Sequence, residues 1–234
     1  MFSGIIQCTA YVHSIKQQAV TLPDKSTTLV THGLSLLVDQ NYSKNLQLGA
    51  SCAINGACLT LAQLNEHPNG LTQDQLPHSL VELFFDLTTS TINLTNLGAL
   101  STGDLVHFER SLTASDENGG HIISGHVSGQ GICTKVAQGD FQDMIITFMV
   151  DKTFGDYIVD GGYLAVEGCS LTPRHVTHND DHTFFSVNLV KTTIDRTLFG
   201  QLKVGDRQNI EVDTQTKPIV LLLKQIQQLN LNRR

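Results

Sequence analysis

The sequence predicts an all-β fold built as two similar domains followed by one C-terminal helix. Three observations predict it: short runs of alternating apolar and polar residues recur, several motifs occur twice in the same order, and helical periodicity appears only near the end of the chain. Many short strands separated by turns are typical of a barrel or a sandwich, and the residues alone leave these two architectures open.

Strands are predicted where apolar and polar residues alternate. This pattern predicts half-buried strands at 105–110 and 185–189, and a β-branched and aromatic run predicts a strand at 145–150. Gly, Asn and Asp separate such runs and predict the turns between them.

Four motifs are repeated in order along the chain, which indicates an internal duplication. The matching pairs are 3–6 with 124–127, 55–60 with 167–172, 90–98 with 192–200, and 101–109 with 203–211. Each copy has about 100 residues, a normal size for a small domain. A polar join at 111–120 divides the copies, so we predict domains at 1–115 and 116–216 and a terminal helix at 217–234.

The terminal helix is predicted from a proline and an apolar stripe. Pro218 suits a first helical turn. The stripe follows helical spacing and consists of Ile219, Leu222, Leu223, Ile226 and Leu229. It either packs back on its own barrel or mediates self-association, and we favour self-association.

Composition narrows the class of protein. The 234 residues are 40% hydrophobic and 16% charged, which excludes a disordered chain, and the net charge of −7 argues against a nucleic-acid partner. Five cysteines without CxxC spacing fit free thiols in a reducing compartment. We find no signal peptide and no apolar run of membrane-spanning length, so we expect a cytoplasmic protein with no membrane partner.

A small polar platform is predicted in each copy. A glycine turn at Gly56 precedes Cys58 and Thr60, and the turn at Gly168 precedes Ser170 and Thr172. Residues at i and i+2 of a strand face the same side, so each pair offers two hydrogen-bonding groups. Ordinary edge-strand polarity is the alternative, and the repetition of the pattern in both copies weighs against it.

Histidines and carboxylates supply further candidates. His121 and His126 lie among glycines and serine, where they either move protons near neutral pH or serve as structural hydrogen-bonding groups in a linker. Glu211 and Asp213 share one face of a predicted strand, where they either hold ligand hydroxyls or face solvent. Several His and Asp residues in 173–184 suggest a metal site, but a solvated hairpin loop is the better interpretation.

Seven segments together resemble the riboflavin synthase family: MFSGIIQ, INGACLTL, TNLG, GDLVHFERS, DENGGHIISGHV, EGCSLT and NIEVDTQT. The resemblance covers Met1 to about Val220. It implies two tandem six-stranded antiparallel Greek-key barrels, known as lumazine-binding repeats, and a C-terminal helix that assembles a homotrimer. The implied reaction is the dismutation of two 6,7-dimethyl-8-ribityllumazine molecules to riboflavin and 5-amino-6-ribitylaminouracil, with no cofactor and no metal.

The resemblance also assigns residues to the site. Catalytic positions are Ser51, Cys58, His126, Ser170, Glu211 and Asp213. Cys58, His126 and Ser170 also bind substrate. The other first-barrel binding positions are Gly4, Ile5, Ile6, Leu59, Thr60, Asp86, Leu87, Thr88, Thr89, Ser90 and Thr91, with 86–91 taken as a strand. The other second-barrel positions are Gly125, Val127, Gly161, Leu171, Thr172, Asn188, Leu189, Val190, Lys191, Thr192 and Thr193, with 188–193 taken as a strand.

The chain departs from the family pattern at a few of these positions. Gly161 stands where a lysine is usual, Glu167 where an aspartate is usual, and Ser90 and Thr192 where glutamates are usual. A non-catalytic lumazine- or flavin-binding protein of the same family is therefore the alternative to a synthase.

Overall fold

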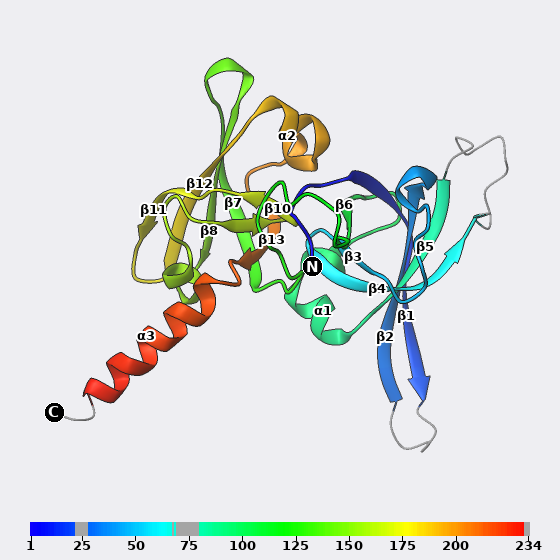
Figure 1. Ribbon diagram of the computed structural model, residues 1–234, viewed down its shortest axis with the longest axis horizontal. Helices are drawn as coiled ribbons and strands as arrows, with labels where there is room; N and C mark the ends of the chain where they lie inside the picture. Colours follow the sequence, from blue (N-terminus) through cyan, green and yellow to red (C-terminus); the bar gives the residue numbers. More distant parts are fainter. Residues whose placement is uncertain (22–27, 67, 69–79, 232–234) are drawn as a thin grey trace.

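The computed structural model describes residues 1–21, 28–66, 68 and 80–231. Two β domains lie side by side, and a helix extends from the second (Figure 1). The first domain contains β1 (Cys8–Thr21), β2 (Thr28–Asp39), β3 (Ser51–Ile54), β4 (Ala57–Asn65), β5 (Leu80–Leu87) and β6 (Leu105–Arg110). These six strands pair antiparallel in the order β1-β2-β5-β4-β3-β6 and close into a barrel, as predicted.

The second domain repeats this arrangement with one strand divided in two. Its strands are β7 (Gly129–Gln138), β8 (Met144–Asp151), β9 (Leu164–Val166), β10 (Cys169–Leu171), β11 (Arg174–His178), β12 (His182–Leu189) and β13 (Arg207–Val212). The sheet order is β10-β9-β13-β7-β8-β12-β11, so β10 and β11 form its two edges. The second domain is therefore not the closed six-stranded barrel that the resemblance implies, but a seven-stranded sheet whose hydrogen bonding is interrupted between β10 and β11.

Pro173 explains the interruption. The repeat aligns β4 with the segment that contains both β10 and β11, and it aligns Leu61 with Pro173. Leu61 donates its N–H to the Ala50 carbonyl at 2.9 Å, whereas proline has no N–H to donate. The chain therefore leaves one edge of the second sheet and joins the other.

The β5–β6 and β12–β13 connections each contain a short α-helix followed by a 3-10 helix, and one longer helix follows the second domain. The α-helices are α1 (Thr89–Leu94), α2 (Lys191–Arg196) and α3 (Thr216–Leu231). The short 3-10 helices are Gln40–Tyr42, Asn96–Ala99, Asp140–Gln142, Lys152–Tyr157 and Leu198–Gln201. Among the described residues, no helix is long and apolar enough to cross a membrane.

Two local predictions are wrong in part. The segment 105–110 was expected to be half-buried, but both faces of β6 are covered, because His107 and Glu109 face the other domain and the N-terminal segment rather than water. The segment 173–184 was expected to be a loop, but residues 174–178 form β11 and pair with β12.

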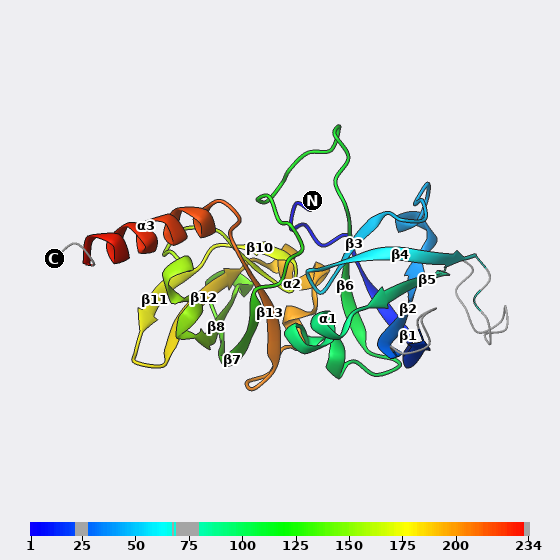
Figure 2. The same cartoon turned by 90° about the horizontal axis from the view of Figure 1, so that it is seen from below.

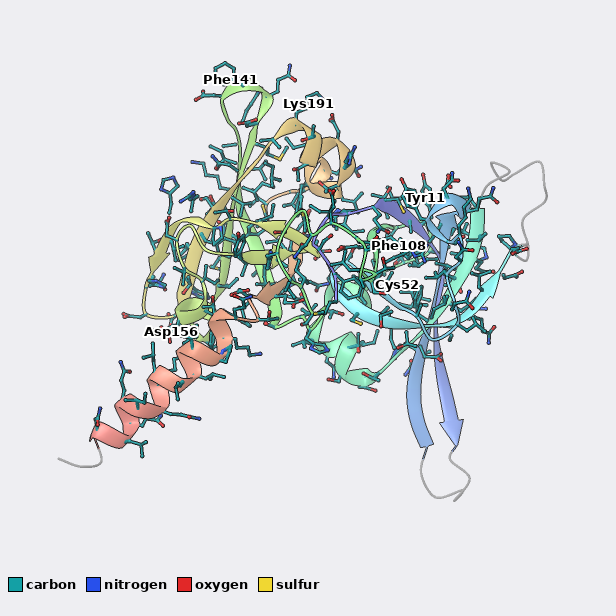
Figure 3. All side chains as sticks on the ribbon, in the orientation of Figure 1. Tyr11, Cys52, Phe108, Phe141, Asp156 and Lys191 are labelled. Atoms are coloured by element: carbon teal, nitrogen blue, oxygen red, sulfur yellow. The ribbon has the colours of Figure 1, made fainter. Side chains whose placement is uncertain are left out.

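Each domain has its own apolar core, and each core includes one residue from the other repeat. Val127 packs in the first core with Leu59 and Leu97, and Ile6 packs in the second core with Leu171 and Phe199. Cys52 and Phe108 lie in the interior of the first barrel in Figure 3. A third cluster joins the domains and consists of Phe2, Ala53, Ile123 and Ala165.

Helix α3 extends away from the second domain (Figure 2). Asp156, labelled in Figure 3, forms an ion pair with Lys224 of α3, with 2.6 Å between Oδ2 and Nζ. The Lys224 ammonium also lies 5.1 Å from the centre of the Tyr157 ring. The predicted helix is confirmed, but the stripe side chains Ile219, Leu222, Leu223, Ile226 and Leu229 are between 45% and 61% exposed. The alternative in which the stripe packs on its own barrel is therefore wrong.

Candidate functional site

The two predicted platforms follow matching hairpin turns. Asn55-Gly56 and Glu167-Gly168 all have positive φ, as two-residue type I′ hairpin turns require. Beyond each turn, Cys58 and Ser170 are half-buried and Thr60 and Thr172 are exposed, as expected for pairs on one face of a strand. The turns also touch, because a Cβ atom on Gly56 would lie 2.5 Å from the Gly168 nitrogen.

Each platform is covered by a segment that precedes the other barrel. The Ser170 amide donates to the Gly4 carbonyl at 2.9 Å, and the Cys58 amide donates to the Gly125 carbonyl at the same distance. Both glycines have positive φ, and a Cβ on either would lie within 2.6 Å of the Cβ of its partner. These two positions require glycine because only glycine combines this conformation with such a close approach.

The exchange of these segments corrects the predicted grouping of the site. Residues 4–6 were assigned to the first pocket and residues 125–127 to the second. The structure places Gly4, Ile5 and Ile6 against the second barrel and Gly125 and Val127 against the first. The reason is an antiparallel bridge between Phe2 and Ile123, which crosses the two segments at the domain boundary.

A pocket of about 200 Å³ lies at the second platform. Its walls come from the crossing N-terminal segment, the strand β10 and the helix α2. The lining residues are Gly4, Ile5, Ile6, Cys169, Ser170, Thr192, Thr193, Arg196 and Thr197. It therefore brings together predicted positions from both repeats.

The predicted pocket strands end earlier than expected. Strand β5 ends at Leu87 and β12 at Leu189, so Asp86, Leu87, Asn188 and Leu189 lie on strands. Thr88 caps α1 by accepting from the Thr91 amide, and Val190 precedes α2. The remaining predicted positions lie in the first turns of these helices, namely Thr89, Ser90, Thr91, Lys191, Thr192 and Thr193. The threonine cap and the helix-compatible lysine are signals that favoured a helix start.

Other predicted positions occupy the strands around the platforms. Ser51 pairs with Thr60 across β3 and β4. Leu59 and Leu171 are buried and point into the cores. Gly161 is exposed, and its amide donates to the Pro173 carbonyl at 2.8 Å.

The two predicted carboxylates stabilise backbone. Glu211 is buried, accepts from the Ser124 amide and hydroxyl through Oε1, and accepts from the Gly125 amide through Oε2. Asp213 lies just beyond β13 and accepts from the Thr216 amide and hydroxyl, which caps the start of α3. The expectation of one shared strand face is wrong, since β13 ends at Val212.

The two histidines differ in their surroundings. His121 Nδ1 lies 2.7 Å from the Ser170 hydroxyl, and its ring stacks on Tyr163 at 5.0 Å. Burial lowers the pKa of His121, and the charge of Asp213 opposes this shift. A neutral imidazole at this distance can accept the Ser170 proton. His126 is exposed beside Gly125 at the first platform.

The seam between the barrels holds polar residues that the sequence interpretation missed. His107 Nδ1 lies 3.0 Å from the Glu167 carbonyl and Nε2 accepts from the Leu198 amide, which fixes the tautomer with the proton on Nδ1. The aligned residue Asn209 donates to the Asn55 carbonyl and accepts from the Asn96 amide. The repeat alignment pairs 107 with 209, and this correspondence was the available signal.

Burial changes the acidity of two seam residues. Desolvation lowers the pKa of His107 to about 4, against the effect of its hydrogen bond to the Glu167 backbone. Desolvation raises the pKa of Glu167 to about 8, although the Asn209 amide and the Asn96 side chain both donate to its carboxyl group. Both residues line a crevice of about 430 Å³.

The cysteines form no disulfide, and the described residues form no metal-binding cluster. All five cysteines are free, and burial raises the pKa of Cys8, Cys52 and Cys169 to about 12. No group of three or more His, Cys, Asp or Glu side chains among the described residues is arranged to hold a metal ion.

Comparisons with known proteins agree with this architecture. The sequence pattern of the lumazine binding domain family matches residues 3–111 and 124–213. The chain is 35% identical to riboflavin synthase of Escherichia coli (strain K12) over 220 residues, which cover 94% of this chain and 90% of that protein. It is 35% identical to riboflavin synthase of Buchnera aphidicola subsp. Schizaphis graminum over 226 residues, 97% of this chain and 95% of that protein. The solved structure of LumP complexed with riboflavin superposes with a TM-score of 0.70 at 19% identity, covering 92% of this chain and all of that one.

Proposed function

The chain belongs to the riboflavin synthase family, and on this premise we propose that it converts two 6,7-dimethyl-8-ribityllumazine molecules into riboflavin and 5-amino-6-ribitylaminouracil. The observation that carries the proposal is the duplicated platform, Cys58 with Thr60 and Ser170 with Thr172, each covered by a segment from the other repeat. Two like platforms suit a reaction that consumes two like molecules.

Proximity supplies much of the proposed catalysis. One lumazine loses a proton from its C7 methyl group, and C7 of the other is attacked by a nucleophile before a four-carbon unit passes between the rings. Holding two rings face to face makes their encounter effectively unimolecular. Backbone amides and carbonyls of the crossing segments and hydroxyls of the platform would orient each ring and its ribityl chain.

Ser170 and His121 are the proposed proton-transfer pair of the second pocket. Their 2.7 Å contact permits a proton to pass between the hydroxyl and the imidazole, and the charge of Asp213 stabilises the imidazolium form. At the first platform Cys58 aligns with Ser170, and the exposed His126, which aligns with Ile5, is the histidine beside it in the proposal, with Ser51 on the neighbouring strand. Glu211 supports the Gly125 segment instead of contacting substrate.

A homotrimer is part of the proposal. The exposed stripe of α3 supports self-association, since a helix with five half-exposed apolar side chains would bury them against copies of itself. In such an assembly the first barrel of one subunit would face the second barrel of another, and the two bound lumazines would meet between them. We take 1–115, 116–216 and 217–234 as the three units, and the free cysteines fit a cytoplasmic location.

The non-catalytic alternative is less favoured. The synthases match at 35% identity over nearly the whole chain, whereas LumP matches at 19% and supports only the fold. Ser170, His121 and both platforms are also present here.

Turnover tests the proposal directly. Purified protein incubated with 6,7-dimethyl-8-ribityllumazine is expected to generate riboflavin fluorescence and one equivalent of the aminouracil. Stable binding of the lumazine without any riboflavin formation would instead identify a binding protein.

Sedimentation tests the oligomer. Leu222→Lys places a charge in the apolar stripe and is expected to shift the protein from trimer to monomer. Gln228→Lys adds the same charge on the opposite face of α3 and is the matched control. Equal sedimentation of the two variants would show that the stripe does not hold the subunits together.

A further inference from the structure

Two buried glutamates occupy equivalent positions and hold the two crossing segments. The repeat aligns Glu109 of β6 with Glu211 of β13 and aligns Ser3 with Ser124. Glu109 Oε1 accepts from the Ser3 amide and hydroxyl, each at 2.8 Å, and from the Gly4 amide at 3.2 Å. Each glutamate therefore belongs to one barrel and supports a segment that covers the platform of the other.

The link from Glu109 to the second pocket is short. Glu109 fixes Ser3 and Gly4, the Gly4 carbonyl accepts from the Ser170 amide at 2.9 Å, and Ser170 lines the pocket. The Ser3 hydroxyl also lies 3.3 Å from the Ile5 amide, so the same carboxyl group fixes the bend that presents Ile5 to the pocket.

The two glutamates differ in how their oxygens are used. Glu211 distributes three donors over both oxygens, as an ionised, acceptor-only carboxylate does. Glu109 places all three donors on Oε1, and within the described part of the chain its buried Oε2 has no hydrogen-bond partner.

A buried oxygen without a donor favours the uncharged form of its group. Leaving a neutral polar atom without a partner costs far less than leaving a buried charge without one. Burial raises the pKa of Glu109 against the opposing effects of Ser3, Gly4 and, least of all, the Ile5 backbone, which agrees with this geometry.

We propose that Glu109 is a positioning residue for the second pocket, acting from the first barrel as a neutral carboxylic acid, while Glu211 positions the first pocket as a carboxylate. This inference rests on the proposed function only in naming the ligand. The different use of their oxygens predicts different responses to glutamine. At 109, a glutamine oxygen can take the three donors, and its NH2 group then occupies the place of Oε2, which accepts no hydrogen bond from the described residues. At 211, the glutamine NH2 group must face the amide of either Gly125 or Ser124.

Amide hydrogen exchange tests the positioning without any ligand. Glu109→Ala is expected to accelerate exchange at the Ser170 amide by about tenfold or more while leaving Cys58 unchanged, since the loss of two or three hydrogen bonds has at least that weight. Glu211→Ala is expected to show the reverse. Uniform acceleration at both amides, or at neither, would overturn the proposal.

Rescue by glutamine tests the protonation state. Riboflavin titrated into the wild type is expected to fill two sites per chain, and each alanine variant is expected to weaken one of them about tenfold. Compared with Glu109→Ala, Glu109→Gln should restore slow amide exchange at Ser170 and riboflavin binding at the second site. Compared with Glu211→Ala, Glu211→Gln should restore neither the slow exchange at Cys58 nor riboflavin binding at the first site. Equal rescue at both positions would contradict the asymmetry.

The controls separate this inference from the proposed function. If the wild type bound no riboflavin, the proposed function would fail, and the exchange pattern would still decide the role of Glu109. If an alanine variant of either glutamate does not fold, Ser3→Ala and Ser124→Ala are used in its place, since each removes only one donor to the carboxyl group. Their expected effects fall on Ser170 and Cys58 respectively, and exchange at the opposite amide would refute the assignment.

Discussion

The two barrels contain the same parts but differ in one strand. In the first barrel β4 is one continuous strand that carries the platform and pairs with β5. Its counterpart in the second domain is divided at Pro173 into β10 and β11. The platform, the glycine turn and the short helix are present in both. The difference teaches that the pocket depends on the turn and the crossing segment, and that an unbroken hydrogen-bonded barrel is not required for it.

The largest expected effect comes from moving this break into the first barrel. Leu61→Pro removes the N–H that bonds to Ala50 and a fully buried side chain, so we expect unfolding to become easier by more than about 3 kcal/mol. The reverse change, Pro173→Leu, should alter stability by less than about 1.5 kcal/mol, because that strand already tolerates the break. Urea unfolding measures both. Similar losses in the two variants would mean that the barrels are equally strained at this position.

The next effect concerns the close approach at the first platform. Gly125→Ala introduces a Cβ 2.5 Å from the Cys58 Cβ in a left-handed conformation, and we expect a loss of about 3 kcal/mol together with weaker ligand binding. Gly103→Ala is the control, since Gly103 also has positive φ but no atom lies within 4 Å of the added methyl group, and strain alone costs about 1 kcal/mol. Thermal unfolding and riboflavin titration would reveal whether the contact, beyond the backbone strain, matters.

A smaller effect is expected from pH at the seam. The pKa of Glu167 is raised to about 8, so the folded protein retains a proton that the unfolded chain releases near its ordinary value. The stabilisation is therefore complete at low pH and is lost as pH rises through about 8, amounting to about 2 kcal/mol between pH 6.5 and 8. His107 has the opposite effect on stability, and only below the pKa that it has in the unfolded chain, since folding lowers the pKa of its imidazole to about 4.

Glu167→Gln tests this asymmetry between the repeats, because the aligned residue of the first barrel is the non-ionising Asn55. The urea midpoint of the variant is expected to change less with pH than that of the wild type between pH 6.5 and 8.5. A wild-type slope that survives the substitution would have to arise from another group.

The smallest effect concerns the helix that follows only the second barrel. Asp213→Ala removes the cap of α3 and is expected to cost about 1 kcal/mol, whereas Asp213→Asn retains a capping oxygen and the helix. Both variants remove the charge that supports the imidazolium form, so both should lower the pKa of His121, which NMR titration measures. If the pKa of His121 did not change, the charge of Asp213 would have no effect on the histidine beside Ser170.

The sequence predicted the duplication, the two platforms and the terminal helix, because repeats, alternation and amphipathic spacing are local signals. The choice of a barrel over a sandwich came from the family resemblance. It did not predict which pocket receives residues 4–6, since the crossing depends on the contact between Phe2 and Ile123, far apart in the chain. It also misjudged Glu109 and His107. Alternation indicates one buried and one exposed face, and here the second domain covers His107 and the N-terminal segment covers Glu109 on the face expected to meet water.

The exchange of segments between the barrels is the central claim, and a crystal structure with riboflavin bound tests it most directly. The ligand at Ser170 is expected to contact Gly4 and Ile5 together with Thr192 and Thr193, all from the walls of one pocket. A ligand that instead contacts Gly4 and Ile5 together with Cys58 and the start of α1 would contradict the exchange.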